Sequence, residues 1–118
     1  MFGEQNGGTL VPLTMSSALV ELDQYSPDWQ LAQVPEAEAE EPRVFTTQVN
    51  FDVPFANVPM VHVGISGFDI DNRDTARLSV RTGAISATGF ELVVLTWMNT
   101  RVYKVEVSWL ALGHQAAV

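Results

Sequence analysis

From Arg43 onward, apolar and polar residues alternate with a period of two. The first alternating run places one set of side chains on a single face of a strand: Phe45, Thr47, Val49, Phe51 and Val53. Further short runs lie at 61–65, 77–81, 90–97 and 102–112, and polar, proline- or glycine-containing segments separate them. Short strands with frequent turn signals, and no helical period, are typical of an antiparallel β-sandwich. The pattern therefore predicts an all-β fold for this part of the chain.

Two of these runs indicate how the sandwich is packed. The run 90–97 is almost continuously apolar, which predicts a strand covered on both faces. In the last run, Tyr103, Val105 and Trp109 share one side and are expected to face the core. The acidic segment GFDIDNRD, which follows Ile65, is expected to be a polar loop.

The first 42 residues show no comparable alternation. Ser16 to Leu22 is compatible with a strand or a turn of helix, and PEAEAEEP at 35–42 has the composition of a linker. A flexible tail is one interpretation. The alternative is that the apolar piece packs on a partner chain or a larger assembly, which Tyr25 and Trp29 favour, because a solvated tail has little use for such aromatics. We therefore predict an acidic arm and linker at 1–42, a sandwich at 43–113 and a tail at 114–118.

Charge supports this division. Residues 1–42 contain eight carboxylates and no Lys or Arg, whereas residues 43–118 contain six carboxylates and six basic residues. A net charge of −8 argues against nucleic-acid binding, which needs clustered basic residues. No run approaches the about 20 apolar residues of a membrane helix, so no membrane insertion is expected. The start MFGEQNGG lacks the features of a signal peptide, which predicts an extracellular or particle-surface location reached by another route, or otherwise a cytoplasmic one.

The residues that usually carry catalysis or bind metals are scarce. The chain has no cysteine and two histidines, of which His62 fits a half-buried strand position and His114 a tail. Asp69, Asp71 and Asp74 lie close together but lack the spacing of a calcium loop. No nucleophile, phosphate-loop or dinucleotide motif occurs. We therefore expect no enzyme activity, no cofactor and no metal site.

The segment TWMNTRVY, at 96–103, forms the strongest candidate site together with Arg77. Two aromatics, a polar turn and a guanidinium on neighbouring strands are the groups that a sugar site uses. Aromatic faces stack on the C–H surface of a pyranose, and Arg and amide groups hydrogen-bond its hydroxyls. From the residues alone, core aromatics with a surface arginine remain the alternative.

Several motifs in register resemble those of a known family: VNFDVPFANVPMVHVGISGFDID, ARLSV, SATGF and TWMNTRVYKVEVSWLALG. Over about residues 43–113, the chain resembles the H-type lectin domain of snail agglutinins and the C-terminal domain of slime-mould discoidins. This resemblance implies a six-stranded antiparallel sandwich that assembles as a homotrimer, or as two stacked trimers. It also implies calcium-independent sites for galactose or N-acetylgalactosamine, in clefts between subunits.

The resemblance also implies which residues bind sugar. Arg77 matches the family's sugar-binding arginine, Trp97 the aromatic of the TW motif and Tyr103 the tyrosine that walls the pocket. Met98 stands where the snail agglutinin has a sugar-contacting histidine, a departure that removes one hydrogen-bond partner. The family's acidic ligand falls near Glu40.

These observations predict a non-catalytic lectin module that recognises cell-surface glycans. The alternative is a structural trimeric spike or fibre subunit of a virion or phage-like particle. In that alternative, the N-terminal arm anchors the subunit to a larger protein assembly and the sugar pocket is vestigial.

Overall fold

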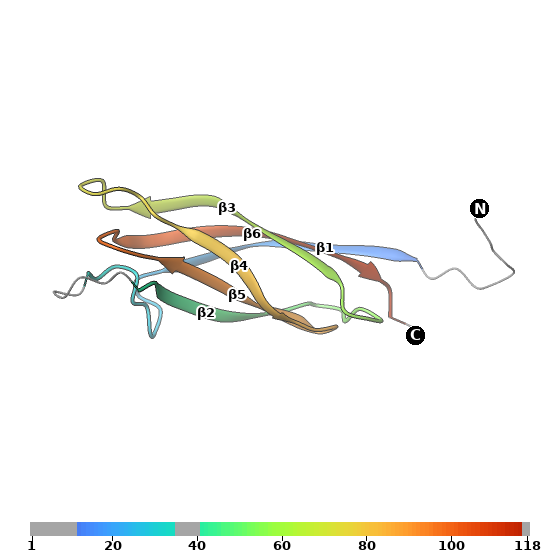
Figure 1. Ribbon diagram of the computed structural model, residues 1–118. Helices are drawn as coiled ribbons and strands as arrows, with labels where there is room; N and C mark the ends of the chain where they lie inside the picture. The colour runs from blue at the N-terminus through green and yellow to red at the C-terminus, as the bar shows by residue number, and fades with distance from the viewer. Residues whose placement is uncertain (1–11, 35–40, 117–118) are drawn as a thin grey trace, which may run out of the picture.

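The computed structural model describes residues 12–34 and 41–116 and folds them as two packed antiparallel sheets of three strands each (Figure 1). In chain order, the strands are β1 (Leu13–Asp23), β2 (Arg43–Asn50), β3 (Met60–Ile70), β4 (Ser79–Ile85), β5 (Gly89–Thr96) and β6 (Val102–His114). One sheet has the order β1-β6-β3 and the other β2-β5-β4. The prediction of an all-β, six-stranded antiparallel sandwich is confirmed.

The first strand comes from the segment that was expected to be a separate arm, so the domain boundary at residue 42 is corrected. β1 pairs with β6 along its whole length, from Leu13 opposite His114 to Asp23 opposite Lys104. The alternation of apolar and polar residues did not indicate this strand, because some of its outward side chains are also apolar. Leu13 and Met15 point outward and are each 65% exposed. A strand with apolar residues on both faces shows no alternation. The parts of the expected arm at 1–11 and 35–40 lie outside the described residues.

The segment after β1 also contributes to the core. Trp29 is 8% exposed and Leu31 is completely buried, whereas Tyr25 is 85% exposed. The Trp29 indole N–H donates to the Val102 carbonyl at 2.9 Å, and the Val102 amide donates to the Leu31 carbonyl at 2.7 Å. These bonds attach the β1–β2 connection to the start of β6.

The core lies between the two central strands, β5 and β6. Phe90, Leu92 and Val94 of β5 are fully buried against Val105 and Val107 of β6. At one end of the core, Trp109 packs against two rings, with centroids 5.5 Å from Phe90 and 5.7 Å from Phe51. The outward side of β5 is partly covered as well: Leu95 is 6% exposed and Glu91 and Val93 are half-buried.

Strand ends differ from the sequence prediction in β2, β3, β4 and β6. β4 spans Ser79–Ile85 and not 77–81, so Arg77 precedes the strand. β3 continues to Ile70 through two register shifts, so Asp69 lies in a strand and only the rest of GFDIDNRD is loop. β2 ends at Asn50, which leaves Val53 68% exposed and not on the core face. His114 ends β6 and does not begin a tail, and Gln115 forms an isolated bridge with Phe55.

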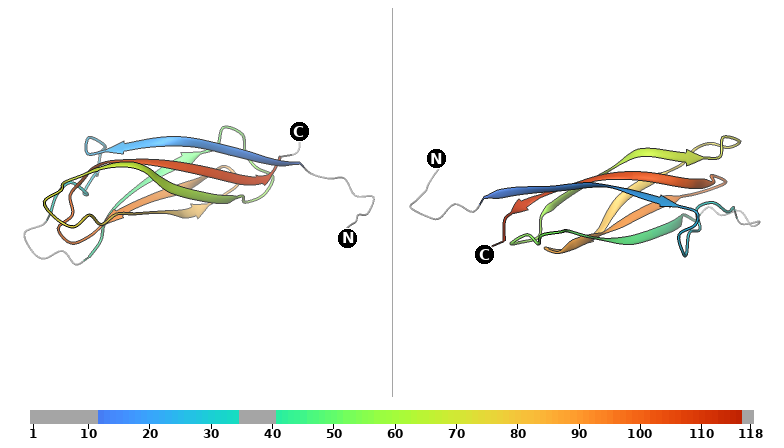
Figure 2. Two further views of the ribbon diagram at one scale, coloured as in Figure 1. Left: turned by 90° about the horizontal axis from the view of Figure 1, so that it is seen from above. Right: turned by 180° about the vertical axis from the view of Figure 1, so that it is seen from behind.

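The connections group at the two ends of the sandwich. The β3–β4 connection, the β5–β6 hairpin and the described part of the β1–β2 connection lie at one end, whereas β1 begins and β6 ends at the other (Figures 1 and 2). In the described part of the chain, no helix is long and apolar enough to cross a membrane.

Candidate functional site

Two buried hydroxyls join the β3–β4 connection to the β5–β6 hairpin. The Thr100 hydroxyl, on a fully buried residue, donates to the Thr75 carbonyl at 2.5 Å. The Thr96 hydroxyl, also fully buried, donates to the Arg77 carbonyl. The backbone of Arg77 therefore lies beside Thr96, the last residue of β5. Trp97 follows Thr96 in the sequence. The loop and the hairpin form one surface at this end of the sandwich.

A polar network lies on this surface around Asn99. The Arg77 guanidinium donates to the Asn99 side-chain oxygen at 3.1 Å, and the Asn99 amide nitrogen donates to an Asp74 carboxylate oxygen at 2.9 Å. The other Asp74 oxygen accepts from Arg101 at 3.3 Å. Asn99 was not singled out from the sequence, where an amide in a polar turn has no distinguishing pattern. The network presents the acceptor oxygens of Asp74 and Asn99 beside the N–H donors of Asn99, Arg77 and Arg101, and such groups are suited to hydrogen bonding with adjacent hydroxyl groups.

A second network fixes Tyr103. Its hydroxyl donates to an Asp71 carboxylate oxygen at 3.0 Å, and Asp71 also accepts from the Arg73 backbone amide at 2.9 Å and forms an ion pair with the Arg73 guanidinium. These bonds, chiefly that from the Arg73 side chain, hold the pKa of Asp71 well below its usual range. The bond to Asp71 therefore holds the half-buried Tyr103 side chain in place, and the hydroxyl oxygen can still accept a hydrogen bond.

The lowered pKa of Asp71 predicts how the loop responds to acid. A carboxyl whose pKa is lower in the folded state adds stability above its unfolded pKa of about 4, and this stability is lost as the pH falls toward the folded value. Between about pH 4 and pH 2, we expect the unfolding free energy of Asp71→Asn to decrease less than that of the parent, because the variant has no carboxylate at this position to protonate. Urea unfolding across this pH range measures the effect. Asp52→Asn, at an exposed carboxylate, is the control, and equal acid slopes for the parent and Asp71→Asn would contradict the assignment.

Met98 forms the tip of the hairpin in an unusual backbone conformation. Its φ is 59°, in the left-handed region that non-glycine residues seldom adopt, and its side chain is 44% exposed. Trp97 beside it is half-buried, and the Thr100 amide donates to the Trp97 carbonyl at 3.4 Å. The turn therefore presents a thioether to solvent between Trp97 and Asn99.

The structure thus brings four of the five expected site residues to one end of the sandwich. Arg77 comes from the β3–β4 connection, Trp97 and Met98 from the hairpin, and Tyr103 from the start of β6. The fifth, Glu40, lies outside the described residues. Among those that are described, no group of three or more His, Asp or Glu residues is arranged to hold a metal ion.

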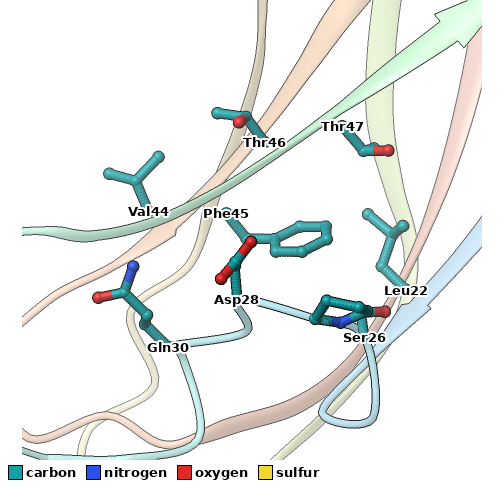
Figure 3. Close-up of a pocket in the computed structure, with 9 residues that line it drawn as sticks. Leu22, Ser26, Asp28, Gln30, Val44, Phe45, Thr46 and Thr47 are labelled. Carbon is teal, nitrogen blue, oxygen red and sulfur yellow. The ribbon is translucent and has the colours of Figure 1, made fainter.

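A separate cavity of about 480 Å³ lies between the end of β1 and the start of β2 (Figure 3). The Asp28 carboxylate, the Phe45 ring and the Thr46 hydroxyl are among the groups that line it, and none of the expected sugar-binding residues does. The cavity is therefore distinct from the surface that carries Arg77.

A family model described as "H-type lectin domain" matches residues 46–112. A protein of Fuscovulum blasticum, described as "ATP synthase subunits region ORF 7", is 38% identical over 72 residues, which are 61% of this chain and 63% of that protein. The chain therefore matches less than two thirds of this relative's length.

Two solved structures of discoidin II from Dictyostelium discoideum share the fold. The recombinant native protein superposes with a TM-score of 0.69 and the wild-type protein with 0.65, each at 25% identity. They match 87% and 86% of this chain, respectively, and 38% of their own chains. Because the match to discoidin II covers 87% of this chain, it extends beyond residues 46–112.

Proposed function

Because this chain belongs to the H-type lectin domain family, we propose that it is a non-catalytic carbohydrate-binding module whose site is the surface formed by Arg77, Trp97, Met98 and Tyr103. The observation that carries the proposal is the pairing of Arg77 with Asn99, next to Trp97 and Met98. A guanidinium held by an amide is a fixed donor for sugar hydroxyls, and adjacent aromatic and thioether surfaces cover C–H groups.

The sugar class we propose is of galactose or N-acetylgalactosamine type. Asp74 and Asn99 supply acceptors and a donor that fit vicinal hydroxyls, and Arg77 supplies further donors. Met98 offers no hydrogen bond of the strength that a histidine would give, so we expect it to contact an apolar part of the ligand. We further propose that the acidic segment around Glu40 completes the site of a neighbouring subunit.

Assembly as a homotrimer is supported by the outer face of the β1-β6-β3 sheet. In one row across this face, Met15 lies opposite Leu112, which lies opposite Met60. The apolar side chains of the face are between 39% and 73% exposed in the single chain: Leu13, Met15, Leu19, Met60, Leu110 and Leu112. An exposed apolar row of this kind is typical of a protein–protein contact. Other copies of the chain are the partners that we propose to cover it.

Oligomerisation matters for function because one monosaccharide site is weak. A monosaccharide has few atoms, and its hydroxyls are well hydrated before binding. Several sites on one assembly bind a dense glycan surface more tightly by avidity.

The proposal is tested by screening the full chain against immobilised glycans, after light scattering has given its mass in solution. Binding to glycans with terminal galactose or N-acetylgalactosamine would support the lectin function. A folded trimer that binds no glycan would instead support the alternative, a structural spike or fibre subunit.

A charge placed on the apolar face tests the assembly. Leu112→Glu puts a carboxylate at the centre of the row, where its burial between copies carries a large desolvation cost. We expect the variant to sediment as a folded monomer and to lose binding to glycan surfaces that depends on avidity. Val58→Glu, at a 64% exposed apolar residue in the β2–β3 connection, is the matched control. A Leu112→Glu protein with the mass of the parent would refute this interface.

A further inference from the structure

Arg43, the first residue of β2, has an environment that the sequence did not indicate. It is 8% exposed, and its guanidinium donates to five main-chain carbonyls. Three of them, on Gln30, Leu31 and Gln33, belong to the β1–β2 connection. The other two belong to the β5–β6 hairpin: Met98 at 3.1 Å and Thr100 at 2.6 Å. One side chain therefore joins two segments that are more than fifty residues apart in sequence.

This arrangement is costly for a residue with only a structural role. Among the described residues, the ion pairs involve Arg73, Arg101 and Lys104, so Arg43 is buried there without a carboxylate partner. Burial, followed by the nearby charge of Arg101, lowers the pKa of Arg43. In the part of the chain that the structure describes, the Arg43 Nε has no hydrogen-bond partner. Removing a guanidinium from water costs free energy, and the charge-assisted hydrogen bonds to the carbonyls offset this cost. The clearest effect of Arg43 is to fix the relative positions of the carbonyls that it binds.

The carbonyls in the hairpin belong to the turn that carries the candidate site. The Met98 carbonyl follows directly on the left-handed φ of 59°, so the bond from Arg43 holds this turn in a strained conformation. Trp97 precedes Met98, and Asn99, the partner of Arg77, follows it. A change in the turn would move all three side chains relative to Arg77.

We propose that Arg43 is a positioning residue for the glycan site: without contacting the sugar, it sets the placement of Trp97, Met98 and Asn99 relative to Arg77. This role rests on the proposed function for its effect on binding, but the effect on the hairpin can be measured without a ligand. Lysine cannot substitute, because a single ammonium group does not span carbonyls from two segments as a planar guanidinium does.

The test compares Arg43→Lys with Arg81→Lys, in which an exposed arginine of β4 undergoes the same change. Amide hydrogen exchange is followed along the chain, and affinity for immobilised galactose-type glycans is measured well below the unfolding temperature. In Arg43→Lys, we expect faster exchange confined to residues 30–33 and 97–102. We also expect affinity to fall about tenfold, the equivalent of one well-placed hydrogen bond to the ligand. Arg81→Lys should match the parent in both measurements.

Each outcome decides a separate point. Faster exchange spread evenly over both sheets would show that Arg43 stabilises the whole domain and would overturn the inference. Unchanged exchange at residues 97–102 would also overturn it, because the hairpin would then not depend on Arg43. Local loosening with unchanged affinity would overturn the link to binding. If the parent itself binds no glycan, the proposed function fails, and exchange alone decides whether Arg43 positions the hairpin. If Arg43→Lys does not fold, hydrogen exchange in the parent protein tests the inference. The amides of Thr100 and Val102 should exchange as slowly as those of the sheet strands. Exchange as fast as in an exposed loop would overturn the inference.

Discussion

Arg77→Ala is expected to remove detectable glycan binding while leaving the fold unchanged. Hydrogen bonds from a charged donor contribute about 1.5–3 kcal/mol each, so losing this donor weakens binding by about 10- to 100-fold. For a site that is already weak, such a loss falls below detection on a glycan surface. The side chain of Arg77 is half-buried, and its hydrogen bond to the Asn99 side chain is exposed. Its removal should therefore change the unfolding free energy by about 0.5 kcal/mol or less.

The measurement is a titration of the parent and the variant on the same glycan surface, together with thermal unfolding of both. Arg81→Ala removes an exposed arginine from β4, outside the network of Asn99 and Asp74, and should bind like the parent. Undiminished binding by a folded Arg77→Ala protein would place the sugar site elsewhere on the molecule.

Deleting residues 1–41 is expected to prevent folding. The deletion removes all of β1 and, with it, the pairing partner of β6 on one side. It also removes Trp29 and Leu31 from the core and three of the carbonyls that satisfy Arg43. Truncating one buried tryptophan or leucine to alanine costs about 2–5 kcal/mol, and the total stability of a domain is about 5–15 kcal/mol. The loss of all these contacts together exceeds what the remaining sandwich can supply.

Circular dichroism and gel filtration of the truncated protein measure the outcome. Deletion of residues 1–11 alone is the matched control, since it leaves β1 complete, and this shorter protein should fold. A folded and monodisperse 42–118 fragment would show that β1 is dispensable and would restore the interpretation of the whole segment as an arm.

The sandwich was predictable where one face of a strand is apolar and the other polar. β2 and β6 satisfy this condition, and β5 was predicted from its nearly continuous apolar run; all three were found to within a few residues of their observed positions. β1 does not satisfy the condition, because its outward residues are part of an apolar face that a single chain leaves exposed. With apolar residues on both faces, β1 lacks the alternation by which a strand is predicted from sequence.

The side chains of the candidate site were predicted from the sequence, but the residues that hold them in position, Arg43 and Asn99, were not. Arg77, Trp97 and Tyr103 belong to motifs with recognisable chemistry, and the structure places them at one end of the sandwich. Arg43 looked like an ordinary polar residue at the start of a strand, because its partners are main-chain carbonyls that carry no sequence signal. Asn99 was likewise indistinguishable from any turn residue until its bonds to Arg77 and Asp74 were seen.

The pairing of Leu13 with His114 determines how the molecule can be tethered. The start of β1 and the end of β6 lie side by side at the end of the sandwich opposite the β5–β6 hairpin (Figures 1 and 2). A fluorescent tag, a resin or a particle joined through the start of β1 or the end of β6 is therefore held away from Arg77 and Tyr103. Immobilised by either end, the domain should point its hairpin outward, so that the tether does not obstruct an approaching glycan.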